Sequence, residues 1–223
     1  MCHKSCIEFG SAHLSYEDVA GKNVIEVGSY NVNGSLRSII KKLNPYKYIG
    51  VDISEGEGVD EICDITNLIS HYGKESFDLV ICTEVMEHVR HWRKAIFNLK
   101  HILKPTGVII LTTRSYGFHF HGHPFDYWRY ELDDIRVIFS DLLIDIIEKD
   151  NSRPGVFVKA SKPIYFTEKD LEHYDLYSIV IEKRCRNISD FRINLFKIKE
   201  FVRVFFSHLL PTFVKSYIRK IHK

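Results

Sequence analysis

The chain has 223 residues, which is enough for one α/β domain and a short additional segment. Hydrophobic residues make up 45% of it, so a sizeable core is expected. No segment approaches the roughly 18 uninterrupted apolar residues of a membrane span, and the amino end lacks the apolar region of a secretory signal. The five cysteines show no C-x-x-C spacing, which favours a reducing, cytoplasmic environment. We interpret Cys2, His3 and Cys6 as part of a frayed terminus rather than as metal ligands.

Residues 23–34 predict a buried parallel strand that turns into a helix. An apolar run contains Glu26 two positions before Gly28, and Gly34 follows where a helix would begin. Such a turn lets the amino end of the helix face a ligand. The next apolar run ends in Asp52, whose carboxylate can accept hydrogen bonds from both hydroxyls of a ribose. A dinucleotide fingerprint needs a third glycine, so an NAD-linked reductase is disfavoured.

Apolar runs alternate with amphipathic segments along the chain, which predicts a parallel sheet covered by helices. We expect strands near residues 23–28, 47–53, 61–63, 77–83 and 107–113, and helices near residues 34–43, 65–72, 91–103 and 133–141. Two more strand-like runs, 142–149 and 155–161, are joined by a turn and predict an antiparallel hairpin. The predicted fold class is therefore α/β.

Over roughly residues 20–162 the sequence resembles the class I S-adenosylmethionine-dependent methyltransferases. The resemblance consists of the segments Glu26-Val27-Gly28, Asp52, Asp64-Ile65, 77–84 and 103–111. In the last run Thr106 stands where the common form has glycine, but Gly107 remains to form the turn. The resemblance implies a Rossmann-like fold, with a mostly parallel seven-stranded sheet ending in an antiparallel hairpin, and S-adenosylmethionine as cofactor.

The resemblance also implies a set of cofactor-binding residues near the ends of the first four strands: Glu26, Gly28, Ser29, Asn33, Gly34, Asp52, Ile53, Asp64, Ile65, Thr83 and Glu84. Glu26 would order the first loop, whose turn would approach the methionine part of the cofactor. Asp52 would hold the ribose, Ile53 would lie against the adenine, and Asp64 would meet the adenine amino group. Taken singly, the glycines could be plain turns and the aspartates helix caps.

A histidine-rich, aromatic segment follows the fifth predicted strand. It includes His119, His121 and His123, and a loop with so much aromatic surface usually covers a ligand or a partner. Its pattern His-Pro-x-Asp-Tyr-Trp-Arg, at 123–129, resembles a subset of small methyltransferases associated with the modification of surface glycans and related polar metabolites. In those enzymes the loop forms a lid on the acceptor side. The alternative is a loop packed around its own aromatic side chains.

Methyl transfer to a hydroxyl requires an aligned acceptor and a group that removes its proton. Histidine titrates near neutrality, so we predict His88 and His121 as candidate bases, with Asp126 as the next candidate. The predicted function is O-methylation of a hydroxyl on a small polar or glycan-type acceptor.

The segment Glu84-Val-Met-Glu87-His88, followed by a downstream histidine, also resembles the metal site of small-RNA 3′-end 2′-O-methyltransferases and of some quinone O-methyltransferases. Carboxylates and imidazoles suit a divalent cation, which would lower the pKa of a hydroxyl. Helix capping by Glu87 and His88 is the alternative, and we prefer it, so no metal ligand is predicted. RNA methylation ranks lower because only Arg114 and Arg129 are basic near the loop. A cofactor-binding subunit without catalysis is disfavoured by the histidines.

Residues 184–223 differ from the rest in charge. They contain ten Lys and Arg and two Asp and Glu, a net charge of +8, so residues 1–183 carry −6. Apolar residues recur there at helical spacing: Phe191, Leu195, Ile198, Val202, Phe205 and Leu209, then, after Pro211, Phe213, Tyr217 and Ile221. We predict a methyltransferase domain at 1–183 and a basic amphipathic helical tail at 184–223. The tail suits an anionic membrane surface or a partner, and packing on its own domain is an equal alternative. Nucleic acid is disfavoured because the domain is acidic.

Overall fold

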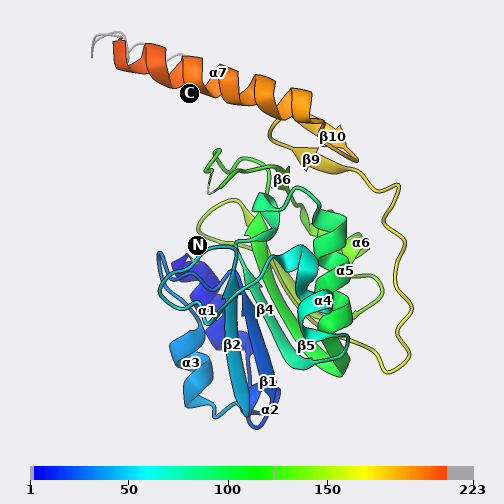
Figure 1. Ribbon diagram of the computed structural model, residues 1–223. Helices are drawn as coiled ribbons and strands as arrows, with labels where there is room; N and C mark the ends of the chain where they lie inside the picture. The colour runs from blue at the N-terminus through cyan, green and yellow to red at the C-terminus, as the bar shows by residue number, and fades with distance from the viewer. Residues whose placement is uncertain (1–2, 123, 210–223) are drawn as a thin grey trace.

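The computed structural model describes residues 3–122 and 124–209 and contains two sheets (Figure 1). The larger sheet has seven strands in the order β3-β2-β1-β4-β5-β8-β7. Strands β1 to β5 are parallel, and β8 runs antiparallel to both of its neighbours. The predicted sheet and its hairpin are confirmed, with these bounds: β1 Asn23–Val27, β2 Lys47–Asp52, β3 Glu61–Ile62, β4 Phe77–Thr83, β5 Leu103–Arg114, β7 Leu143–Lys149 and β8 Gly155–Ser161.

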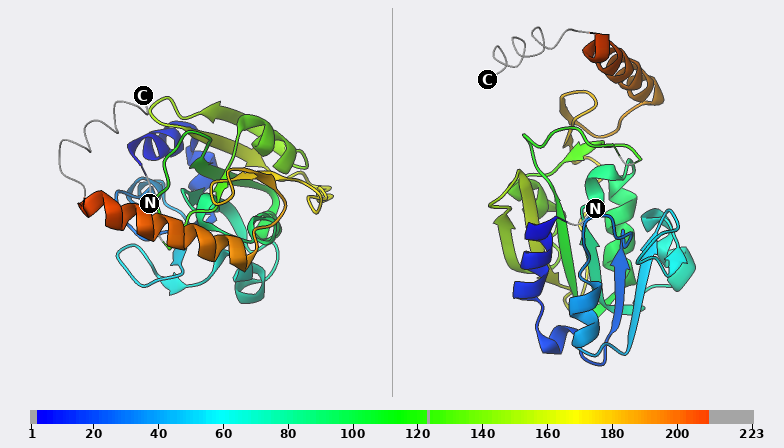
Figure 2. Two further views of the ribbon diagram at one scale, coloured as in Figure 1. Left: turned by 90° about the horizontal axis from the view of Figure 1, so that it is seen from above. Right: turned by 90° about the vertical axis from the view of Figure 1, so that its left-hand side faces the viewer.

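Helices cover both faces of this sheet, and each face has its own apolar cluster. Residues from α1, α2 and α3 pack on one face, and residues from α4, α5 and α6 pack on the other (Figures 1 and 2). The helices are α1 Lys4–His13, α2 Tyr16–Val19, α3 Arg37–Lys42, α4 Leu68–Tyr72, α5 Trp92–Ile102, α6 Leu132–Ile138 and α7 Asp190–Leu209, with 3₁₀ turns at Ile65–Asn67 and Met86–His88.

Strand β4 shows why the apolar runs of the sequence become central strands. Its side chains alternate, so that Leu79 and Ile81 join one cluster while Val80 and Cys82 join the other. A parallel strand that is covered on both faces needs apolar residues at successive positions, which is what the sequence provides.

Two predicted helices and one predicted strand have different bounds in the structure. Helix α3 begins at Arg37 rather than residue 34, because Asn31 accepts a hydrogen bond from the backbone N–H of Gly34 (3.0 Å) and holds that segment as a loop. Helix α6 ends at Ile138, three residues before its predicted end at residue 141. Strand β5 begins at Leu103, four residues before its predicted start at residue 107.

The expectation of a frayed amino terminus is wrong for the described residues. Helix α1 begins at Lys4, and its Cys6 is fully buried in the core rather than available to a metal. The hydroxyl of Ser5 donates a hydrogen bond to Asp150 (2.8 Å), which fixes the start of α1 to the end of β7. Cys2 lies outside the described residues.

A second, antiparallel sheet of three short strands was not predicted. It consists of β6 Trp128–Arg129, β9 Leu176–Ser178 and β10 Lys183–Cys185 in the order β10-β9-β6. The first residue of the predicted tail, Arg184, therefore lies in β10, and the first part of the predicted helical tail forms α7. The helical positions predicted after Pro211 lie outside the described residues. Seen from above, α7 lies across one end of the molecule (Figure 2, left). No helix within the described residues is long and apolar enough to cross a membrane.

Candidate active site

A cavity of about 700 Å³ opens where β1, β2 and β4 end. This volume is within the range of small-molecule sites, and the position is the one at which open α/β sheets bind ligands. One side is lined by residues that follow β1, β2 and β3, among them Gly28, Tyr30, Val32, Asp52, Ile53, Asp64 and Ile65. The other side is lined by residues that follow β4 and by two residues of the histidine-rich loop, among them Glu84, Val85, His88, Arg90, His91, Pro124 and Tyr127.

The turn after β1 requires glycine at position 28. Gly28 has a φ of +78°, and a Cβ there would lie 2.1 Å from a methyl carbon of Val85. The backbone N–H groups of Gly28 and Ser29 both donate to the carbonyl of Val51 (2.8 and 3.0 Å). Gly28 lines the cavity, whereas the Ser29 side chain is buried beside Gly50, where an added Cβ would lie 2.7 Å from its Oγ. The Ser29 side chain therefore packs against β2 and does not line the cavity.

Glu26 lies beneath this loop and does not line the cavity. Ser35 donates a hydrogen bond to its carboxylate (3.2 Å), and the hydroxyl of Tyr48 donates to it as well. Burial raises the pKa of the Glu26 carboxyl above its usual value, more than these donors lower it. These contacts tie the loop to α3 and β2, as a loop-ordering role requires. Asn33 and Gly34 also lie away from the cavity, and Gly34 approaches Ile7 of α1.

Two carboxylates line the other part of this side. Asp52 accepts hydrogen bonds from the backbone N–H groups of Tyr30 and Ser54 (both 3.3 Å), so its position is fixed by the loops on either side. Asp64 accepts from the N–H of Thr66 (2.7 Å) and is the N-cap of a 3₁₀ turn. The capping interpretation therefore applies to Asp64, although the residue also lines the cavity. Ile53 and Ile65 are the apolar lining residues beside the two carboxylates.

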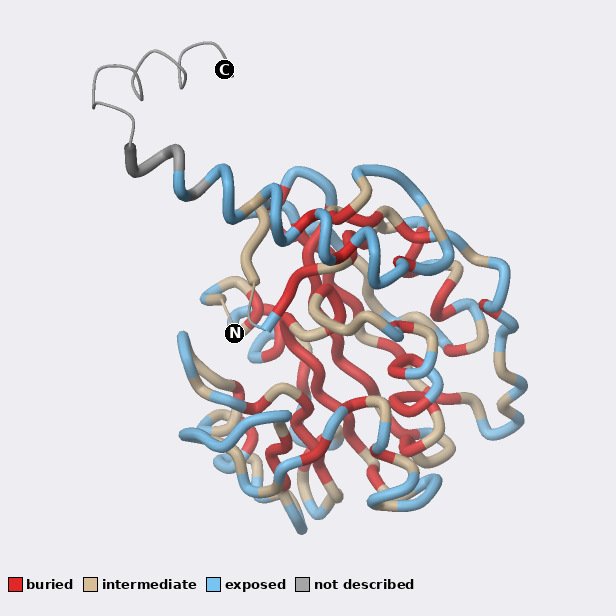
Figure 3. Tube along the Cα trace, turned by 45° about the horizontal axis from the view of Figure 1, so that its top comes forward, coloured by how far each residue is buried: buried red, intermediate tan, exposed pale blue. Residues whose placement is uncertain are grey.

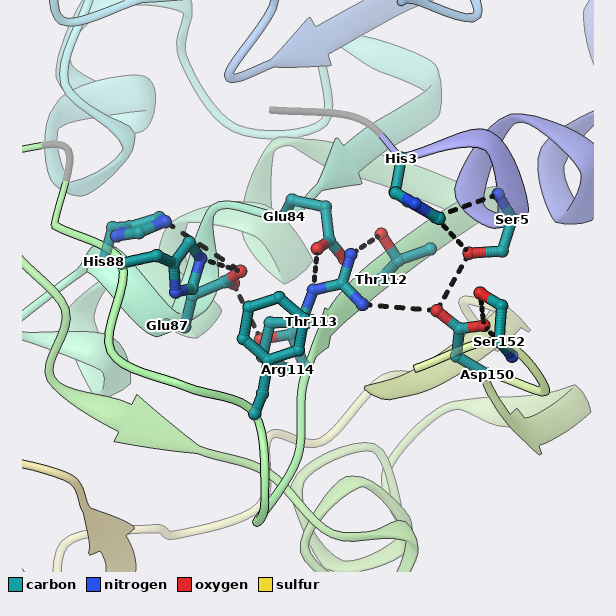
Figure 4. Close-up of polar contacts among 12 residues, drawn as sticks. His3, Ser5, Glu84, Glu87, His88, Thr112, Thr113, Arg114, Asp150 and Ser152 are labelled. Carbon is teal, nitrogen blue, oxygen red and sulfur yellow. Dashed lines mark hydrogen bonds and ion pairs between the residues drawn. The ribbon is translucent and has the colours of Figure 1, made fainter. Parts of the chain in front are cut away.

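At the tip of β4, Glu84 is held by a buried ionic network (Figure 4). It forms an ion pair with Arg114 and accepts a hydrogen bond from Thr112 (3.0 Å), and Arg114 also lies 3.2 Å from Asp150. Glu84 borders the cavity, but its carboxylate is satisfied within the protein. Thr83 is buried and does not line the cavity. Glu84 is therefore not one of the groups that the structure gathers around the histidines.

Glu87, His88 and His121 come together beside the cavity, and His88 lines it. The Glu87 side chain is fully buried, and its Oε1 lies 3.9 Å from Nε2 of His88 and 3.7 Å from Nε2 of His121. Thr113 donates to the other carboxylate oxygen of Glu87 (2.9 Å). Figure 4 shows Glu87 and His88 beside the ionic network of Arg114.

The two histidines differ in the partner of Nδ1 and in their charge. Nδ1 of His88 lies 2.8 Å from the carbonyl oxygen of Phe125, to which it must donate, so Nε2 is left to accept a proton. Burial lowers the pKa of His88 below its usual value, more than Glu87 raises it. Burial would also lower the pKa of His121, but Asp126 and Glu87 raise it to about 9. At neutral pH His88 is neutral and His121 is a cation.

Asp126 is committed to the protein and is not available as a base. Its two oxygens lie 2.5 and 2.8 Å from the guanidinium nitrogens of Arg129, and one of them lies 2.9 Å from Nδ1 of His121. Trp128 is fully buried and donates to the carbonyl of Arg90 (3.2 Å). Most of the His-Pro-x-Asp-Tyr-Trp-Arg pattern thus fixes the loop, while Pro124 and Tyr127 face the cavity. His119 is exposed, and His123 lies outside the described residues.

Sequence reasoning missed several lining residues. Tyr30 and Val32 lie in the loop after β1, and the signal that could have been used is the presence of two large apolar residues between Gly28 and Gly34. Val85, Arg90 and His91 line the cavity because the 3₁₀ turn after β4 folds back over it, and nothing in their local sequence indicates that.

Residues 5–142 match the protein family described as "Methyltransferase domain". The chain belongs to this methyltransferase family. The matched residues include the cavity-lining segments and end where β7 begins, so the hairpin, the second sheet and α7 lie beyond the match.

Several solved structures with a similar fold are described as methyltransferases, all at low sequence identity. One is an S-adenosylmethionine-dependent methyltransferase from Mesorhizobium loti (17% identity, TM-score 0.52, 68% of this chain and 94% of that chain). Another is the 1,6-didemethyltoxoflavin-N1-methyltransferase from Burkholderia thailandensis, with bound 1,6-didemethyltoxoflavin and S-adenosylhomocysteine (12%, 0.58, 71% and 78%). A third is a putative S-adenosylmethionine-dependent methyltransferase from Listeria monocytogenes (13%, 0.56, 71% and 98%). At these identities the likeness shows the fold, which is the Rossmann-like methyltransferase fold. No curated protein sequence matches the chain.

Proposed function

We propose that this chain transfers a methyl group from S-adenosylmethionine to a hydroxyl of a small polar or glycan-type acceptor. The observation that carries the proposal is a single cavity with two unlike sides. Gly28, Asp52 and Asp64 line one side, and the neutral His88 lines the other together with Tyr127.

The first side has the chemistry that an adenosine needs. Asp52 offers a carboxylate to the ribose hydroxyls, and Ile53, which is half exposed, offers an apolar surface to the adenine. The glycine at position 28 lets a ligand approach the backbone closely. Two structural neighbours are described as S-adenosylmethionine-dependent, and a third holds S-adenosylhomocysteine, which supports the same cofactor here.

The second side has the chemistry that a hydroxyl acceptor needs. Methyl transfer from a sulfonium is an in-line displacement, so the protein must align the acceptor oxygen and take its proton. Nε2 of His88 can take that proton because its partner nitrogen is held by the carbonyl of Phe125. His121 is already protonated at neutral pH, so its role is to hold Glu87 and Asp126 together.

The proposal is tested by calorimetry followed by a methyl-transfer assay. S-adenosylmethionine is titrated into the full chain, with NADH as the control ligand, and methyl transfer to a panel of polyhydroxylated compounds is then measured. We expect binding of S-adenosylmethionine alone, in the micromolar range typical of metabolite sites. Binding of NADH without binding of S-adenosylmethionine would contradict the cofactor assignment, and transfer only to amines or thiols would contradict the acceptor class.

A metal-assisted reaction is the second candidate, because one observation favours it. Oε1 of Glu87 and one ligand atom each of His88 and His121 lie within 4.8 Å of one another, and Oε1 is buried without a hydrogen-bond donor. Both Nδ1 atoms face oxygen acceptors, as is usual for metal-binding histidines. A carboxylate and two imidazoles fit a divalent cation, which would lower the pKa of the acceptor hydroxyl. Glu84, which the sequence resemblance included, is paired with Arg114 instead.

Two measurements distinguish proton removal by His88 alone from the metal-assisted reaction: binding of a divalent cation, and activity after the cation is removed. Calorimetry with Mn²⁺ and Mg²⁺ on the full chain shows whether a cation binds, and the variant Glu87→Gln should abolish that binding if these three side chains hold it. Activity that survives a chelator, in a chain that gives no heat with either cation, supports His88 as a base acting without metal. Activity that disappears with chelator and returns with Mn²⁺ supports the metal-assisted reaction.

A further inference from the structure

Helix α7 packs on the domain through the face that carries Ile193 and Phe196. Ile193 and Phe196 are buried, and the ring of Phe196 lies 5.1 Å from Phe120 and 5.9 Å from Phe125, measured between ring centroids. At the start of the helix, Arg90 lies 2.5 Å from Asp190. Helix α7 therefore rests on the same histidine-rich loop that closes the acceptor side of the cavity.

The opposite face of α7 is an apolar stripe that is largely exposed. Its six members are between 43% and 72% exposed: Phe191, Leu195, Ile198, Phe201, Val202 and Phe205. At about 100° per residue these positions fall on the side of the helix away from Ile193 and Phe196. Figure 3 shows exposed positions along α7 where it projects from the domain. Packing on its own domain, one of the two alternatives for the tail, thus accounts for one face of the helix and leaves the apolar stripe unexplained.

Basic side chains border this stripe. Arg192, Lys199 and Arg203 are exposed and lie along one side of the stripe, about 90° to 135° from its centre at 100° per residue. Lys199 and Arg203 have acidic neighbours 3.7 and 2.6 Å away, but exposed pairs of this kind contribute little and leave the basic groups available. Across residues 184–223 the net charge is +8, against −6 for the rest of the chain.

We propose that α7 docks on an anionic lipid surface, with the apolar stripe in the headgroup region and Arg192, Lys199 and Arg203 against the lipid phosphates. An interfacial helix is distinguished by this arrangement of an apolar face bordered by Lys and Arg. A second copy of the chain fits less well, because pairing two stripes would bring like-charged borders together. The proposal does not depend on the reaction, since the surface is separate from the cavity.

The experiment is flotation of the full chain with vesicles of neutral phosphatidylcholine, with and without anionic phosphatidylglycerol. We expect flotation with anionic vesicles at low salt and release at high salt, because the attraction of Lys and Arg is screened. The double variant Ile198→Glu/Val202→Glu should weaken partitioning by about a hundredfold or more, since two apolar side chains leave the lipid. Replacing Arg192, Lys199 and Arg203 by Gln should weaken it by about a hundredfold, mainly on anionic vesicles.

The matched control is Ile164→Glu/Tyr165→Glu, which changes two apolar residues that are 67% and 94% exposed in the connection after β8. This control should float as the unaltered chain does. Binding of S-adenosylmethionine, and the circular dichroism spectrum, should be the same in all variants, which excludes misfolding. Absence of flotation would overturn the proposal. So would a dimer in solution that Ile198→Glu/Val202→Glu converts to a monomer, because the stripe would then be an interface between copies.

Discussion

The two sides of the cavity are built by different means. On the cofactor side, a turn that requires glycine and two carboxylates at strand ends line the cavity, and each of them can be recognised from the residues next to it in the sequence. On the acceptor side, the groups are buried charges from distant segments, such as Glu87 after β4 and His121 and Arg129 after β5. A local turn can be recognised from its sequence, whereas a buried network is defined only by packing. Substitutions on the two sides should therefore differ in what they disturb.

The largest effect is expected from the buried ion pair of the acceptor side. Asp126→Ala leaves the guanidinium of Arg129, which is 1% exposed, without its counter-ion, and should lower the free energy of unfolding by about 3–5 kcal/mol. The matched control is Asp133→Ala, which removes a pair of the same i,i+3 spacing from the surface and should cost less than about 1 kcal/mol. Urea unfolding measures both. Equal losses would mean that the Asp126 pair does not hold the loop.

The next effect concerns the proposed base. His88→Gln should lower kcat by about a hundredfold or more while S-adenosylmethionine still binds, because only proton removal is lost. His101→Gln, on α5 and away from the cavity, is the control and should leave kcat within about twofold of its original value. Full activity of the His88 variant on its acceptor would show that the base lies elsewhere or that none is needed.

A smaller effect is expected on the cofactor side. Asp52→Ala should weaken S-adenosylmethionine binding by about ten- to a hundredfold, the range expected for lost hydrogen bonds to a charged group. Glu55→Ala, in the exposed loop that follows, changes charge equally and should leave the Kd unaltered. Calorimetry distinguishes them. A Kd that both substitutions change alike would point to general electrostatics rather than to contact with the ribose.

The smallest effect is in the pH dependence of kcat/KM with a chelator present. The base must be neutral, so activity falls as the pH drops through its pKa. Burial lowers the pKa of His88, so it stays neutral further into the acid range. Between pH 8 and pH 6 the loss should therefore be smaller than the roughly fourfold loss expected of a histidine with the usual pKa of about 6.5. An acid limb centred at 6.5 or above would assign the base to another group.

Much of the fold could be predicted because it depends on local patterns. The apolar run of β4 allowed the sheet to be predicted, and the glycine turn after β1 allowed the first loop to be predicted. Helix α1 was missed because its apolar residues Cys6 and Phe9 are few and the segment precedes the first clear strand. The strands β6, β9 and β10 have two or three residues each, too few for alternation to be visible.

The candidate site could be predicted only in part. His88 and Asp52 follow strand tips and line the cavity, as the sequence indicated. The sequence could not show that Glu84 pairs with Arg114, 30 residues away, or that Asp126 pairs with Arg129, three residues away. Which partner a buried charge has depends on how the side chains pack, and not on their spacing in the sequence. Ser29, Asn33, Gly34 and Thr83 belong to the right segments but support the cavity rather than line it.

The most direct test of the two-sided cavity is a crystal structure of the full chain with S-adenosylhomocysteine. We expect the ribose hydroxyls on Asp52, the adenine between Ile53 and Asp64, and the sulfur facing the His88 side of the cavity. A cofactor bound outside this cavity, or one whose sulfur points away from His88, would contradict the central claim.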